Sequence, residues 1–84
     1  MNNKFILESL ASDLKRVALG FNRGSDKMAQ RFLEEALKRR DEVEIENLDL
    51  YIKKLLMTLD NTIDSENALM YSTLIQNYTM YKKF

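Results

Sequence analysis

Apolar side chains in the first quarter of the chain recur at intervals of three and four residues, the spacing that places them on one face of an α-helix. We predict a helix over about residues 3–19. Gly20 then stands where a left-handed C-terminal cap would end the helix. Because the segment 20–24 contains both glycines of the chain, we expect a turn there. The apolar face of this first helix consists of Leu7, Leu10, Leu14 and Val17.

A second helix is predicted directly after the turn. Ser25 is a favourable N-cap residue, and Asp26 puts a negative charge in the first turn, where the helix dipole favours it. A basic run at residues 38–40 suits the C-terminal end of the same helix. The apolar stripe between these two ends is wide and consists of Met28, Ala29, Phe32, Leu33, Ala36 and Leu37.

The segment 41–47 leaves two interpretations open. The apolar stripe that begins at Ile45 is out of phase with the preceding stripe by about two residues, and Asp41 and Glu44 have the spacing of a capping pair. We therefore favour a break, with a third helix that starts between residues 41 and 47. The alternative is one uninterrupted helix over residues 26–59, which ion pairs at i,i+4 and the absence of Gly and Pro would support.

A fourth helix is predicted to follow the turn-rich segment 60–65 and to end near residue 82. No segment has the alternation typical of a strand. Since short connections favour antiparallel neighbours, the expected fold class is all-α. We expect a single domain over residues 1–84, a small antiparallel bundle of four short helices, or three helices if residues 26–59 are continuous. The apolar face expected for the fourth helix holds Tyr71, Leu74, Ile75, Tyr78 and Tyr81.

The composition excludes several kinds of chemistry. The 84 residues include no Cys and no His, so thiolate nucleophiles, imidazole bases, catalytic triads and the usual zinc ligands are all missing. The acidic cluster at residues 41–49 lacks the glycine-bearing loop of a calcium site. We therefore expect no enzymatic activity, no cofactor and no bound metal. No apolar run approaches the roughly 20 residues that a membrane span needs, and we expect a cytoplasmic protein.

Some apolar side chains lie off the predicted core faces. At about 100° per residue, two of them fall together on the far side of the third helix and two more on the far side of the fourth. A chain of this size buries only about 60% of its unfolded surface, and contiguous exposed apolar surface indicates an interface. We predict self-association, most simply as a homodimer, or binding of another protein. The expected contact residues are Leu50, Met57, Leu69, Met80, Tyr78 and Tyr81.

The distribution of charged residues suggests an alternative function. The chain balances 13 basic against 13 acidic residues, so no net field attracts nucleic acid or an anionic membrane. Basic residues nevertheless surround the first turn, beside a helix N-terminus whose free N–H groups favour anions. The alternative to a non-enzymatic protein-interaction module is thus a small nucleic-acid- or anion-binding regulator, although zero net charge disfavours nucleic acid. Its binding residues would be Arg16, Arg23, Ser25, Lys27 and Arg31.

Overall fold

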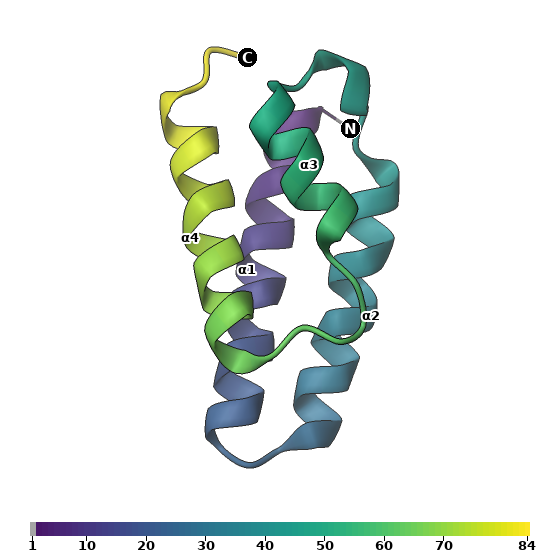
Figure 1. Ribbon diagram of the computed structural model, residues 1–84, viewed down its shortest axis with the longest axis vertical. Helices are drawn as coiled ribbons and strands as arrows, with labels where there is room; N and C mark the ends of the chain where they lie inside the picture. The colour runs from purple at the N-terminus through teal and green to yellow at the C-terminus, as the bar shows by residue number, and fades with distance from the viewer. Residues whose placement is uncertain (1) are drawn as a thin grey trace.

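The protein is all-α, as predicted. The computed structural model describes residues 2–84, and every regular element in that part of the chain is a helix. Figure 1 shows a small elongated bundle with extents of 37 × 20 × 19 Å. The four α-helices and one short 3₁₀ helix are α1 (Asn3–Asn22), α2 (Asp26–Glu42), η1 (Ile45–Asn47), α3 (Leu50–Thr58) and α4 (Ser65–Tyr81).

Helix α1 is the central element of the bundle. It lies between α2 and α4 and runs antiparallel to both, while α3 crosses in front of its N-terminal half (Figure 1). The connection after α3 then passes in front of the C-terminal half of α1 to reach the start of α4. The core is formed where these elements meet, and its largest fully buried side chains are Leu7, Leu10, Leu14, Val17, Leu33, Ile52, Leu56, Leu59 and Ile75.

The close contact between α1 and α2 depends on Gly20. A Cβ atom at this position would lie only 2.7 Å from the backbone nitrogen of Ala29. The prediction that Gly20 caps the first helix is wrong, because α1 continues to Asn22 and the residue with a left-handed backbone is Gly24, at φ 73°. Gly20 therefore allows two helices to approach, and Gly24 makes the turn.

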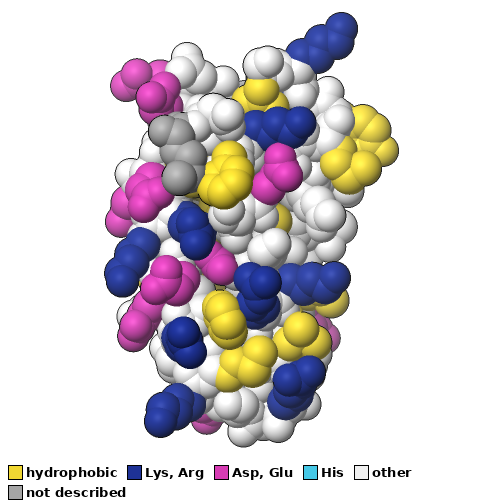
Figure 2. Space-filling view, turned by 180° about the vertical axis from the view of Figure 1, so that it is seen from behind, with side chains coloured by type: hydrophobic (Ala, Val, Ile, Leu, Met, Phe, Trp, Pro, Cys, Tyr) yellow, Lys and Arg dark blue, Asp and Glu magenta, His cyan; other side chains and the backbone are white. Residues whose placement is uncertain are grey.

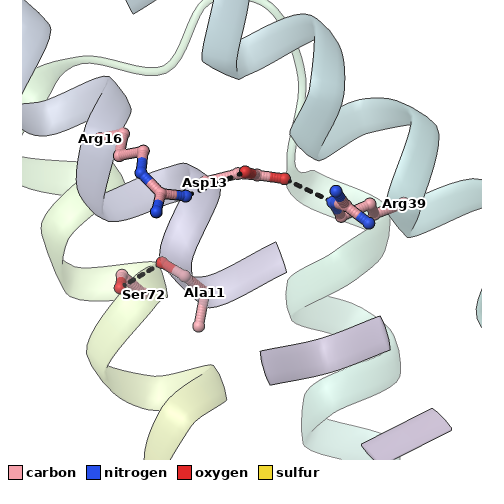
Figure 3. A network of polar contacts seen from close by, with 5 residues as sticks. All are labelled: Ala11, Asp13, Arg16, Arg39 and Ser72. Atoms are coloured by element: carbon pink, nitrogen blue, oxygen red, sulfur yellow. Dashed lines mark hydrogen bonds and ion pairs between the residues drawn. The ribbon is translucent and has the colours of Figure 1, made fainter. Parts of the chain in front are cut away.

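Two buried polar contacts join α1 to its neighbours (Figure 3). The Asp13 carboxylate, on a residue that is only 4% exposed, accepts a 2.7 Å hydrogen bond from Nε of Arg39 on α2, and Arg16 lies 3.6 Å from its other oxygen. On the opposite side, the Ser72 hydroxyl of α4 donates a 2.7 Å hydrogen bond to the carbonyl of Ala11. Because these buried groups have partners, they fix how the helices face one another without leaving polar atoms unsatisfied.

The chain breaks between α2 and α3, so the alternative of one helix over residues 26–59 is wrong. Helix α2 ends at Glu42. The Asn3 side chain donates to the carbonyl of Glu44 at 3.0 Å and accepts from the N–H of Glu44 at 2.9 Å. This pair of hydrogen bonds ties the connection to the start of α1 and satisfies backbone groups that a continuous helix would have used.

The third helix starts later than predicted, at Leu50. The chain first forms η1 and buries Leu48, so the helix cannot begin within 41–47. Asp49 is the N-cap residue of α3, in place of the predicted pair of Asp41 and Glu44. That pair cannot start a helix because α2 still occupies the first of the two residues and the Asn3 contacts hold the second.

Helix α4 begins and ends close to the predicted residues. Asp64 in the turn-rich segment is its N-cap, and the carboxylate accepts a 2.8 Å hydrogen bond from the N–H of Asn67. The helix ends at Tyr81. The side that faces the bundle is formed largely by small residues, so α4 lies close to α1. The buried residues of α4 are Ala68, Ser72, Ile75, Tyr78 and Thr79.

Candidate functional site: the outer face of α4

The structure exposes most of the side chains that were expected to contact a partner. Met57 is 75% exposed, Met80 is 67% exposed and Tyr81 is 81% exposed. Leu50 and Leu69 are also exposed. The expectation that Leu50, Met57, Leu69 and Met80 lie off the core is confirmed, whereas Tyr81 was expected on the apolar face of the fourth helix and is exposed instead. The role of these five residues as contact residues stays a prediction.

Tyr78 is a correction to that set, because only 4% of it is exposed. Its ring makes edge-to-face contacts with Tyr51 and Phe84, at centroid distances of 5.6 and 6.0 Å. Its hydroxyl accepts a 3.0 Å hydrogen bond from the N–H of Asp49, so Tyr78 holds the start of α3 against α4. Partial burial, with smaller contributions from Tyr78 and Asp49, raises the pKa of the Tyr51 hydroxyl. Tyr78 is therefore a core residue.

The exposed apolar side chains lie on two surfaces rather than one. On the α3 side, Met57 lines a shallow groove together with Val43 and Ile45. On α4, Leu69 lines a separate and almost entirely apolar depression together with Met70. The predicted contact residues are thus divided between α3 and α4.

The surface on α4 extends along the whole helix. Figure 1 shows α4 at one edge of the molecule, with the side turned away from α1 and α3 left open. Between Asn67 and Tyr81 the helix has no charged residue, although 31% of the chain is charged. We call its exposed residues on this side the α4 outer face, which consists of Leu69, Met70, Thr73, Leu74, Asn77, Met80 and Tyr81.

The sequence pattern orients this helix correctly only in part, since Ile75 and Tyr78 of the predicted face are buried. It places Leu74 and Tyr81 on the core face, whereas both are exposed in the structure. The inner face is instead formed around small residues, since Ala68, Ser72 and Thr79 allow α4 to approach α1. A helix face assigned from the positions of large apolar residues gives Ser and Thr little weight. The predicted inner face is therefore rotated about the helix axis relative to the observed one. The signal that could have identified the outer face is the charge-free run, which gives α4 no charged side to turn towards solvent.

The predicted anion-binding residues are brought together only in part. The guanidinium groups of Arg16 on α1 and Arg31 on α2 lie 5.4 and 5.9 Å from the ring centre of Phe32. At such distances a cation is attracted to an aromatic ring. Figure 2 shows Lys and Arg side chains around apolar ones on the lower part of the back face, near the end of the bundle with the α1–α2 turn. This part of the molecule is a mixed basic and apolar surface.

The other three predicted anion-binding residues lie at the α1–α2 turn. Arg23 is the C-cap of α1, and Lys27 is exposed in the first turn of α2. The Ser25 hydroxyl accepts a 3.2 Å hydrogen bond from the N–H of Met28, which confirms its role as an N-cap. One N–H group that an anion would need is therefore occupied, and Asp26 places a negative charge at the same helix end.

Two kinds of feature are absent from residues 2–84. In this range no three or more acidic side chains are grouped so that they could hold a metal ion. None of its helices combines the length and the apolar character needed to cross a membrane.

Comparison with protein-family models, curated proteins and solved structures finds no match. Function is therefore inferred from the α4 outer face itself.

Proposed function

We propose that the protein is a non-enzymatic helical interaction module that binds a second copy of itself through the α4 outer face. One observation carries the proposal: a helix with exposed Leu, Met and Tyr side chains has no charged residue between Asn67 and Tyr81. The centres of protein interfaces are depleted of charged residues and enriched in Met and aromatic residues. The composition of the α4 outer face is of this kind.

The size of the chain also supports self-association. The chain has 84 residues, only slightly more than the roughly 70–80 below which a single hydrophobic core rarely supplies more than about 3–5 kcal/mol of net stability. Additional burial of apolar surface contributes roughly 25 cal/mol per Å². An uncharged face meets a copy of itself without like-charge repulsion, and closed two-fold dimers are the commonest oligomers.

Light scattering of two glutamate variants tests the proposal. The wild-type protein at micromolar concentration is expected to have twice the mass of the 9.9 kDa chain. Met70→Glu places a charge on the α4 outer face, and we expect it to return the protein to a monomer. Met57→Glu is the matched control, because Met57 is also an exposed methionine but lies on α3. A monomeric wild type contradicts the proposal, and so does a dimer that Met57→Glu breaks and Met70→Glu does not.

A second candidate function is the binding of a polyanion such as nucleic acid by the mixed basic surface. It is favoured by the convergence of Arg16 and Arg31 on the ring of Phe32. Binding through phosphates weakens steeply as salt rises, so titration of a labelled duplex at two salt concentrations tests it. No binding at low salt excludes this candidate. Both candidate functions are compatible with the cytoplasmic location that we expect from the sequence. Imaging of a fluorescent fusion would test this location.

A further inference from the structure

We infer that two copies associate as an antiparallel α4–α4 pair centred near residue 75, and that the charges at the two ends of α4 set its direction. The inference rests on the proposed self-association and adds how the two copies are arranged. It concerns the exposed side of a helix that is open along its length at the edge of the molecule (Figure 1).

Together with Glu66 in the first turn of the helix, residues of the α4 outer face have the spacing of a helix-pairing seam. Residues 66, 70, 73, 77 and 80 are exposed and recur at alternating intervals of four and three. Side chains at these intervals form a line along a helix and interdigitate with the same line on a second helix. At about 100° per residue, Leu74 and Tyr81 border the line on one side and Leu69 on the other. The apolar surface is therefore wider than the seam itself.

Two polar residues at the centre of the seam select its register. Thr73 and Asn77 stand between Met70 and Met80. In an antiparallel pair centred near residue 75, Thr73 of one copy meets Asn77 of the other, and Met70 meets Met80. The Thr73 hydroxyl donates to the carbonyl of Leu69 at 3.0 Å, so its oxygen can accept from the Asn77 amide of the second copy. A shift by one helical turn would place Asn77 against Met70 or Thr73 against Met80, depending on its direction, and a polar residue in a seam specifies register in this way.

The ends of α4 select the antiparallel direction. Glu66 is exposed in the first turn, and Lys82 and Lys83 follow the last turn. Lys82 already lies 3.4 Å from Asp49, which leaves the exposed Lys83 to act between copies. An antiparallel pair brings Glu66 near Lys83 of the second copy, whereas a parallel pair brings like charges together. Exposed ion pairs contribute little affinity but discriminate between arrangements, and the helix dipoles favour the same direction.

Introduced cysteines can report this arrangement cleanly, because the chain has none of its own. Met70→Cys and Met80→Cys proteins are prepared separately and then mixed under mild oxidation. We expect the mixture to form a disulfide-linked dimer and each variant alone to remain uncross-linked. In the antiparallel pair, the two copies of position 70 are displaced by about 15 Å along the helix axis, at about 1.5 Å per residue, which is beyond the reach of a disulfide. Met57→Cys mixed with Met80→Cys is the control and is expected to give no link.

The outcomes of the cross-linking experiment separate the antiparallel arrangement from the proposed self-association. A disulfide within each single variant indicates a parallel pair and overturns the inference, while the proposed self-association stands. A dimer by light scattering with no disulfide in the mixture overturns the inferred arrangement, and the proposed self-association then stands only if Met70→Glu breaks the dimer. A monomeric wild type also overturns both.

A charge exchange tests the direction independently. Glu66→Lys alone and Lys83→Glu alone are each expected to weaken association by roughly threefold to tenfold at low salt. The double variant with both changes restores the pairing with its charges reversed, and we expect near wild-type affinity. If both single variants associate like the wild type, the end charges do not set the direction and that part of the inference is wrong.

Discussion

Helices α2 and α4 have the same length and the same relation to the central helix, but opposite surfaces. Each has 17 residues and packs along one side of α1 (Figure 1). Helix α2 contains ten charged residues, whereas α4 contains one. Both bury a narrow face of mostly small residues, so the contact with α1 does not require an uncharged outer side. The fold therefore does not account for the uncharged outer side of α4, which is consistent with the proposed self-association.

The largest loss of stability is expected from a substitution at the contact between α1 and α2. Gly20→Val would push side-chain atoms into the backbone of α2 at Ala29, where even a Cβ would lie at 2.7 Å. We expect the free energy of unfolding to fall by about 3 kcal/mol, because helix backbones cannot yield as side chains do. Urea unfolding followed by circular dichroism measures it. Gly24→Ala, at a left-handed position with open space around it, is the control and should cost about 1–2 kcal/mol. Equal losses for the two variants would contradict the role assigned to Gly20.

A smaller effect is expected from the partly buried ion pair between Asp13 on α1 and Arg39 on α2. Asp13→Ala removes the partner of Arg39, whose Nε lies 2.7 Å from the carboxylate. Because Arg39 is one-third exposed and can reach water, we expect a loss of about 2 kcal/mol in urea unfolding. Glu35→Ala is the comparison variant, since its pair with Lys38 is exposed and should contribute less than about 0.5 kcal/mol. A wild-type stability for Asp13→Ala would show that this contact does not hold α1 to α2.

Tyr78→Phe separates the inner side of α4 from its outer face. The variant keeps the aromatic contacts with Tyr51 and Phe84 but removes the hydroxyl that accepts from Asp49. We expect a loss of about 1 kcal/mol and faster hydrogen exchange in the first turn of α3. Tyr81→Phe, on the outer face, should leave both measurements unchanged. A similar response from the two tyrosines would remove the distinction between the two sides of the helix.

The smallest effect on stability is expected in the connection between α3 and α4, outside the two helices compared above. Hydrogen bonds from the side chain and backbone of Thr62 lower the pKa of Asp60 below its ordinary value of 3.8. A lowered carboxyl pKa stabilises the folded state at pH values above the ordinary pKa, and that contribution disappears as pH falls through the lowered value. Thr62→Ala should raise the Asp60 pKa towards the ordinary value in an NMR titration. An unchanged titration would mean that the hydroxyl contact is absent in solution.

The first and last breaks between the helices could be predicted from the sequence, because local signals mark them, whereas the sequence leaves an alternative open for the break between α2 and α3. Gly20–Gly24 and the segment 60–65 contain the turn-forming residues, and Ser25 acts as the predicted cap. The start of α3 could not be predicted in the same way. It depends on Asn3, which holds the backbone of Glu44 from 41 residues away, and no local pattern contains that contact.

The α4 outer face was predicted only in part, and the physical reason differs from that for the start of α3. Exposure of Met57 and Met80 follows from helical periodicity, because each lies opposite a clear core face. Helix α4 is uncharged over most of its circumference, so periodicity alone does not decide which side turns inwards. Close packing decides it, through Ser72 and Thr79 against α1, and this places Leu74 outside.

The methionine methyl groups provide the most direct test of the central claim, that the α4 outer face holds a second copy. The chain has five methionines, of which Met57 lies on α3 and Met70 and Met80 lie on the α4 outer face, so both exposed surfaces are sampled without any substitution. In a dilution series followed by NMR, we expect the signals of Met70 and Met80 to change with protein concentration and those of Met28 and Met57 to stay constant. Signals that are all independent of concentration in a monomeric protein, or a change confined to Met57, would contradict the account.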